Sequence, residues 1–189
     1  MRIKMVKIKT PLITKLDIPE GCEFKRDHGT VTVKGPKGEL KRTIENRNII
    51  IEQDGNILTL KFDKTSKREK KHLFTTKAHI KNMLKGVSEG YTYKLKICSG
   101  HFPMTVTLKN NVIEIKNFIG EVVPRKLIIK DEAKVKIEGD IITVEGIDKE
   151  KTGQAAASIE KLTKRPGFDK RIFQDGIYIT EKDGKKIGQ

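Results

Sequence analysis

The sequence predicts an α+β fold of two tandem similar domains, each a small, mostly antiparallel sheet covered on one face by a helix. The first observation is a pattern that occurs twice: residues 54–60 read Asp-Gly-Asn-Ile-Leu-Thr-Leu, and residues 138–144 read Glu-Gly-Asp-Ile-Ile-Thr-Val. Residues 89–93 and 175–179 form a second matching pair, 86 residues apart against 84 for the first pair. Because solenoid repeats are only about 20–50 residues long, this period indicates two domains.

The first domain is expected over residues 17–98, after a basic N-terminal arm over residues 1–16 that holds five basic and no acidic side chains. Four segments are expected to form strands, most clearly where apolar and polar residues alternate. They lie around residues 30–34, 47–52, 58–62 and 91–97. Gly35-Pro36-Lys37-Gly38 and Asp54-Gly55 are turn sequences that favour connections between antiparallel strands.

Between residues 65 and 84 the apolar period changes to that of an amphipathic helix. The apolar positions are spaced by seven, four and three residues, at Leu73, Ile80, Leu84 and Val87. Thr65 or Ser66 is the expected N-cap, and Gly86 is the expected end. Residues 61–86 hold nine basic and two acidic side chains, so the exposed face of this helix should be strongly basic.

The second domain is expected over residues 102–180, after a linker at residues 99–101 and before a polar C-terminal tail at residues 181–189. It repeats the order of strands, helix and last strand. Strands are expected near residues 104–109, 112–116, 122–130, 133–137, 141–145 and 177–179. Ala155, Ile159 and Leu162 give the helix its apolar stripe.

The charge of the chain favours a polyanionic partner. The 189 residues contain 40 Lys and Arg against 25 Asp and Glu, a net charge of +15, with a pI of about 9.7. Nucleic acid is the usual partner of so basic a small protein. An anionic membrane is the competing partner, but it favours bulky apolar anchors on a basic helix, and the chain has no Trp.

The cysteines and apolar runs favour a cytoplasmic protein. Cys22 and Cys98 do not make a disulfide framework. The longest apolar runs are three residues, whereas a membrane span needs about 20. No apolar segment of a signal peptide follows Met1.

No residue pattern indicates an enzyme, a cofactor site or a metal site. His72 and His79 are seven residues apart, not the four of a helical zinc pair. Gly35-Pro36-Lys37-Gly38 joins two strands, whereas a nucleotide P-loop joins a strand to a helix. Asp175-Gly176 is interpreted as a turn, because Glu89-Gly90 occupies the matching position in the first repeat.

The loop Lys164-Arg165-Pro166-Gly167-Phe168-Asp169-Lys170-Arg171 is the best candidate for RNA contact. It places four cations around a Pro-Gly turn with an aromatic ring among them. Such a loop suits phosphate contact together with stacking on an unpaired base. The basic face of the helix near residues 64–85 is by itself more typical of a solvated surface.

The end of the sequence resembles a known family. Residues 171–182, with Gln154, Ile159 and Lys164 upstream, are similar to the C-terminal signature of the universal ribosomal large-subunit protein L-six family, in its archaeal and eukaryotic branch. Residues 33–40 resemble the N-terminal unit of that family, and the similarity extends from about residue 8 to residue 182. The chain lacks the Tyr-Lys-Gly-Lys-Gly type of stretch that ends the bacterial members.

The resemblance implies a non-catalytic structural protein of the large ribosomal subunit. It implies binding of large-subunit rRNA near the factor-binding region and the stalk base, next to other ribosomal proteins, with the second domain as the main rRNA binder and without homo-oligomers. The candidate RNA-binding residues are Lys164, Arg165, Phe168, Lys170, Arg171, Tyr178, Lys182, Lys34 and Lys37. A free-standing RNA enzyme and a protein-binding scaffold are the alternative functions that the residues themselves leave open.

Overall fold

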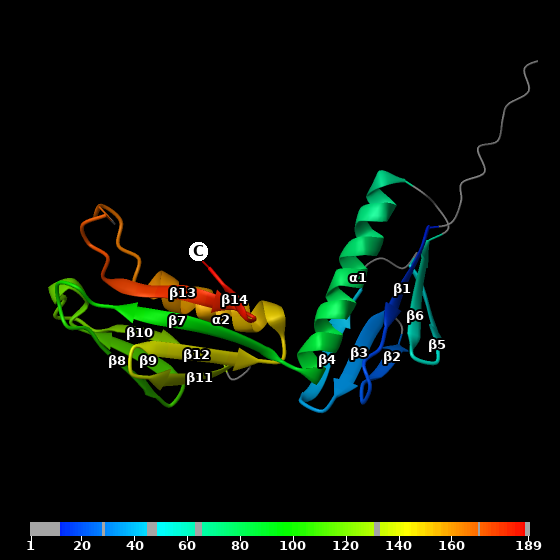
Figure 1. The fold of residues 1–189 in the computed structure, drawn as a ribbon, viewed down its shortest axis with the longest axis horizontal. Helices are drawn as coiled ribbons and strands as arrows, with labels where there is room; N and C mark the ends of the chain where they lie inside the picture. Colours follow the sequence, from blue (N-terminus) through cyan, green and yellow to red (C-terminus); the bar gives the residue numbers. More distant parts are fainter. Residues whose placement is uncertain are drawn as a thin grey trace, which may run out of the picture. The chain divides into compact units, whose positions relative to one another are not determined.

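The chain divides into two compact units, Met1–Glu89 and Gly90–Gln189. A computed structural model represents the structure; it describes residues 12–27, 29–44, 49–62, 66–130, 133–169 and 171–187. Each unit consists of antiparallel sheets and one long helix (Figure 1). The predicted α+β fold of two tandem similar domains is therefore confirmed, although each unit contains two sheets rather than one.

Unit 1 contains two three-stranded sheets. The first has the order β1 (Leu12–Asp17), β6 (Ile57–Phe62), β5 (Ile50–Asp54), and the second has the order β2 (Glu23–Asp27), β3 (Thr30–Gly35), β4 (Gly38–Thr43). Both are covered by α1, which contacts β1, β3, β4 and β6. Strands β1 and β2 were not predicted, and β4 was implied only by the turn at residues 35–38.

Helix α1 (Lys67–Ser88) begins with a capping box at Ser66 and Glu69. Its apolar stripe is buried as predicted. The expected end at Gly86 is wrong, because this glycine is buried inside the helix and the chain continues helically to Ser88. The residue that allows the helix to end is Gly90, whose φ of +77° is the left-handed conformation that glycine adopts most easily.

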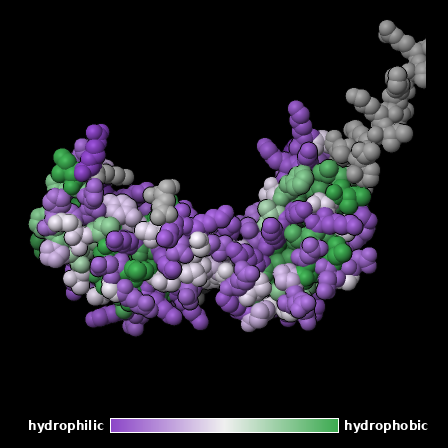
Figure 2. All heavy atoms as spheres, in the orientation of Figure 1, coloured by the Kyte–Doolittle hydropathy of each residue, from purple (hydrophilic) through white to green (hydrophobic). Residues whose placement is uncertain are grey.

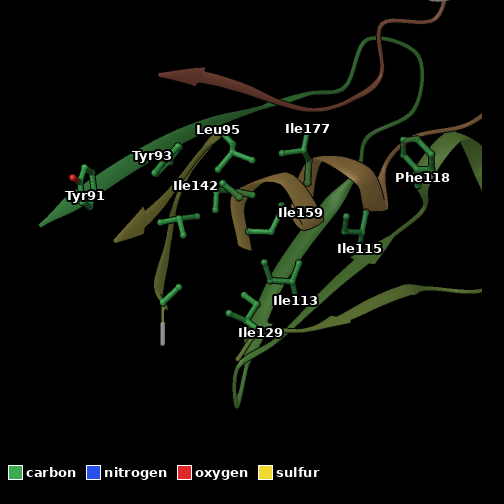
Figure 3. Close-up of a cluster of buried hydrophobic side chains, with 13 residues drawn as sticks. Tyr91, Tyr93, Leu95, Ile113, Ile115, Phe118, Ile129, Ile142, Ile159 and Ile177 are labelled. Atoms are coloured by element: carbon green, nitrogen blue, oxygen red, sulfur yellow. The ribbon is translucent and has the colours of Figure 1, made fainter. Parts of the chain in front are cut away.

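Unit 2 repeats this architecture with one addition. One sheet has the order β10 (Arg125–Ile128), β9 (Val112–Lys116), β8 (Thr105–Lys109); the other has the order β11 (Ala133–Glu138), β12 (Ile141–Gly146), β7 (Tyr91–Cys98), β13 (Gly176–Lys182), β14 (Lys185–Lys186). Helix α2 (Lys149–Leu162) packs on both. Figure 3 shows the core between them, in which Leu95, Ile113, Ile142, Ile159 and Ile177 are fully buried.

The predicted boundary between the two domains is wrong, because strand β7 belongs to unit 2. The sequence predicts that β7 ends the first domain and that residues 99–101 form a linker. In the structure β7 is a central strand of unit 2, paired with β12 and β13, and the units divide at Glu89 and Gly90. The reason is that the repeat equates β7 with β13, whereas these two strands pair with each other, with Ile97 opposite Ile177.

Strand β1 corrects the predicted N-terminal arm. Residues 12–16 belong to β1, where Leu12 lies opposite Phe62 and Leu16 opposite Leu58, and residues 1–11 lie outside the described part. Each unit therefore begins with the strand that pairs with its sixth strand, so β1 corresponds to β7. The predicted tail at residues 181–189 is also corrected, because β13 extends to Lys182 and pairs with β14.

Gly35 brings the turn between β3 and β4 against the end of α1. A Cβ atom at this position would lie 2.7 Å from Val87 Cγ2 and 2.8 Å from the Val87 carbonyl oxygen. The nearby Lys37 N–H donates to that oxygen at 3.0 Å. Since backbone cannot move aside as easily as a flexible side chain, any substituent here must separate the turn from the helix.

We expect Gly35→Ala to lower the free energy of unfolding by about 1–3 kcal/mol, through overpacking against Val87. Urea denaturation followed by circular dichroism measures this change. Gly100→Ala is the control, since the nearest atom to its Cβ would be at an ordinary 3.8 Å. Equal unfolding free energies of the two variants would contradict the close packing of Gly35 against Val87.

Candidate nucleic-acid interface

Three loops meet at one end of unit 2. They cover residues 99–104, 117–124 and 163–175, with residue 170 outside the described part. The Asn117 side-chain amide donates to the Pro103 carbonyl oxygen at 3.1 Å, which joins the first loop to the second. Glu121 lies 3.8 Å from the Arg165 guanidinium, which joins the second to the third. We name this region the three-loop end.

Asp175 joins the first loop to the third. It is buried, with 6% of its surface exposed. Its Oδ1 accepts hydrogen bonds from the backbone N–H groups of Gly100 and His101, and its Oδ2 lies 2.9 Å from His101 Nδ1. Burial by itself would raise the pKa of Asp175, but the hydrogen bonds from His101 and Gly100 outweigh it and lower the pKa. Rather than forming only a turn, this carboxylate fixes two loops.

Arg125 fastens the second loop to the end of α2. Its Nε and Nη2 donate to the two carboxylate oxygens of Glu121 at 2.7 and 2.6 Å, and its Nη1 donates to the Leu162 carbonyl oxygen at 2.6 Å. The hydrogen bonds from Arg125 hold the pKa of Glu121 below its ordinary value. Bidentate contacts of this kind combine strength with fixed geometry, so the second loop has a defined position.

Phe168 lies in a row of side chains that order the third loop. The Arg165 guanidinium carbon is 4.4 Å from the Phe168 ring centroid. The Phe168 and Phe173 centroids are 5.2 Å apart with nearly perpendicular rings, and Phe173 lies 5.0 Å from His101. Phe168 is only half-buried, so its predicted stacking on a base stays a prediction, while its contacts within the protein stabilise the loop.

The cations of the third loop lie at the surface. Lys164 is exposed, and the side chain of Arg171 is 93% exposed. Arg165 is held between Glu121 and Phe168, and Lys170 lies outside the described residues. The loop thus presents positive charge from a backbone that buried contacts hold in place.

Tyr178 lies beside these cations, whereas Lys182 does not. Lys164, Arg165, Phe168 and Tyr178 line one pocket of about 210 Å³, smaller than the roughly 300–1,000 Å³ of typical small-molecule sites. Burial raises the pKa of Tyr178, so its hydroxyl is neutral near pH 7. Lys182 is at the other end of β13, opposite Tyr93.

The two candidates in unit 1 have partners within the protein. Lys34 lies 3.3 Å from Glu39. The Lys37 ammonium donates to the Glu89 carbonyl oxygen at the end of α1, a favourable place for a cation because helix C-termini carry partial negative charge. RNA contact by Lys37 stays a prediction, and the structure gives this lysine a capping contact.

Sequence reasoning missed several residues of the three-loop end. Arg125, Glu121 and His101 are distant in sequence from the basic loop, and no local pattern connects them. Val122 and Val123 fall in the strand predicted near residues 122–130, but they are loop residues, 94% and 78% exposed, and β10 begins at Arg125. Pro124 was the available signal, since proline cannot donate to a strand ladder. In Figure 2 hydrophobic residues are visible at this end of unit 2 beside hydrophilic ones.

Among the described residues, no cluster of three or more His, Cys, Asp or Glu side chains could hold a metal ion. The described helices include none long and apolar enough to cross a membrane.

Comparison with known proteins assigns the chain to a family. The family model of ribosomal protein L6 matches residues 18–90 and 102–176. The chain belongs to the ribosomal protein L6 family. The first match stops at residue 90, before β7, in agreement with the division between the units.

Archaeal relatives support this assignment. The chain is 44% identical to large ribosomal subunit protein uL6 of Methanobrevibacter smithii, over 89% of this chain and 95% of the relative. It is 40% identical to the uL6 protein of Methanothrix thermoacetophila, over 90% and 97%, and 42% identical to that of Ignicoccus hospitalis, over 89% and 93%. The predicted archaeal-type ribosomal protein is confirmed, and its role is structural rather than enzymatic.

Proposed function

We propose that this L6-family chain is a cytoplasmic component of the large ribosomal subunit that binds large-subunit rRNA through the three-loop end. The observation that carries the proposal is the position of the cations. Lys164 and Arg171 are exposed on the third loop, which Asp175 joins to the first loop and Arg125 joins to the end of α2. Cations on a loop whose backbone is held in place suit a folded RNA, because little loop ordering is then required on binding.

In this proposal unit 2 is the main rRNA binder, near the factor-binding region and the stalk base, next to other large-subunit proteins. Lys164, Arg165, Lys170 and Arg171 neutralise phosphates and release counterions. Tyr178 and Phe168 offer the flanking aromatic surface. Lys34, Lys37 and Lys182 are secondary contacts, since they lie outside the three-loop end.

A salt titration of RNA affinity tests the proposal. We expect the purified chain to bind fragments of large-subunit rRNA in filter-binding assays, with log K falling linearly against log salt. Each neutralised phosphate should contribute about 0.7–0.9 to the slope. Affinity that is insensitive to salt, or equal for rRNA and an unrelated RNA of the same length, would contradict specific binding through these cations.

A further inference from the structure

The two units differ at the strand that begins each of them. In unit 2, β7 pairs with β12 on one edge and with β13 on the other. In unit 1, the corresponding strand β1 pairs with β6 on one edge, and no strand of the described part pairs with the other. The position that β13 occupies in unit 2 is therefore open in unit 1.

The pairing register shows which backbone groups face the open edge of β1. The Ile18 N–H donates to the Asn56 carbonyl oxygen at 2.8 Å, so Ile18 and Asn56 are a hydrogen-bonded pair. Because hydrogen-bonded pairs alternate along antiparallel strands, Leu12, Thr14 and Leu16 also bond to β6. The backbone groups of Ile13, Lys15 and Asp17 then point toward the open edge.

Unit 2 shows the chemistry that suits this edge. The Ile97 N–H donates to the Asp140 carbonyl oxygen at 2.8 Å, and the Ile18 N–H makes the same bond to the Asn56 carbonyl oxygen. Ile18 therefore corresponds to Ile97. Lys15, three residues before Ile18, corresponds to Lys94, three residues before Ile97. The Lys94 ammonium lies 3.0 Å from Glu181 on β13, across the strand pair. On a strand added to β1, an acidic side chain at the position equivalent to Glu181 would lie opposite the exposed Lys15.

We propose that the open edge of β1 accepts an extended segment of another protein, antiparallel to β1 and with an acidic residue opposite Lys15. Main-chain hydrogen bonds supply the affinity in this mode of recognition, and Ile13, which is 52% exposed, adds apolar contact. Helix α1 flanks the edge with a further cation, since the Lys77 ammonium donates to Thr14 Oγ1 at 2.7 Å. Lys15 and Lys77 together favour an acidic side chain near the middle of the added segment, whereas the exposed Asp17 at the end of β1 does not.

The chain's own N-terminus is a poor occupant by charge. Residues 1–11 hold four basic and no acidic side chains, so they would repel Lys15 and Lys77. Residues of like charge directly opposite each other destabilise a strand pair. A partner protein in the assembled subunit is the occupant that fits, and this inference rests on the proposed function to that extent.

The test compares the purified chain with the same chain in purified large subunits. We expect the backbone amides of Ile13, Lys15 and Asp17 to exchange with deuterium at least about tenfold more slowly in the subunit. We also expect a zero-length carbodiimide cross-link between Lys15 and a carboxylate of another protein. Equal exchange rates of these amides in the purified chain and in the subunit overturn the inference. Cross-links of Lys15 that are confined to this chain or to a second copy also overturn it, as do photo-cross-links of β1 to rRNA.

A proline variant separates strand addition from folding. Lys15→Pro removes an N–H group that β6 does not use, as edge strands tolerate, while Lys15→Ala removes the charged side chain and keeps the N–H group. Both should fold alone with α1 intact by circular dichroism. In the subunit, the Ile13 amide of Lys15→Pro should exchange as fast as in the purified chain, whereas the Ile13 amide of Lys15→Ala should exchange more slowly. Slow exchange of the Ile13 amide in both variants overturns the inference. Failure of the wild-type chain to co-sediment with large subunits would instead count against the proposed function.

Discussion

Replacing Lys164, Arg165, Lys170 and Arg171 by alanine should weaken binding to large-subunit rRNA on the order of 100-fold at about 0.1 M salt. The slope of log K against log salt should flatten by about 3, since each phosphate contact contributes about 0.7–0.9. Filter binding over a range of salt concentrations measures both quantities. The loss of affinity and the flatter slope should appear together, because both follow from the loss of the phosphate contacts.

A matched control separates this local effect from net charge. Lys109, Lys130, Lys134 and Lys136 are exposed lysines of unit 2 that lie away from the three-loop end. Their replacement by alanine changes the net charge equally but should change the slope by less than about 1. Equal losses in the two variants would show that binding depends on total charge, and the site assignment would then be wrong.

Asp175→Ala should lower the free energy of unfolding by about 2–3 kcal/mol at pH 7. The variant removes a buried carboxylate that accepts three hydrogen bonds and leaves the N–H groups of Gly100 and His101 without their acceptor. It should also weaken rRNA binding, because two of the three loops lose their common anchor. Chemical denaturation at pH 7 measures the first effect; an unchanged stability would contradict the anchoring role.

The same carboxylate predicts a pH dependence. The pKa of Asp175 is lower in the folded chain than its ordinary value of 3.8, so the unfolded state binds the proton more readily. The stability that Asp175 contributes is thus fully present above about pH 4 and is lost as the pH falls through the folded pKa. The difference in unfolding free energy between wild type and Asp175→Ala should therefore shrink on acidification below pH 4.

The sequence repeat predicted two α+β units, but not how the strands are shared between them. Local patterns of turn and strand made β7 equivalent to β13, and the fold pairs these strands with each other. Which strands pair depends on contacts between residues that are distant in sequence. A period-two pattern predicts a strand but does not show which strand it pairs with. The basic charge of residues 1–16 predicted an arm instead of β1, although Leu12 and Leu16 have the spacing of one strand face. Their pairing with Phe62 and Leu58 of β6 is a contact between distant residues.

The candidate site was predicted in part. The cations and Phe168 are contiguous in the sequence, so composition and turn chemistry were enough to single them out. The groups that hold them in place come from other elements: Arg125 from β10, Glu121 from the second loop and His101 from the first. A sequence shows these residues one by one, and only the fold shows that they converge.

Ultraviolet cross-linking of intact large subunits, followed by mass spectrometry, tests the central claim most directly. The account predicts rRNA nucleotides attached to the peptides of residues 161–182, which contain Lys164, Arg165 and Arg171. Cross-links restricted to unit 1, or to the peptides around Lys109 and Lys130, would contradict it.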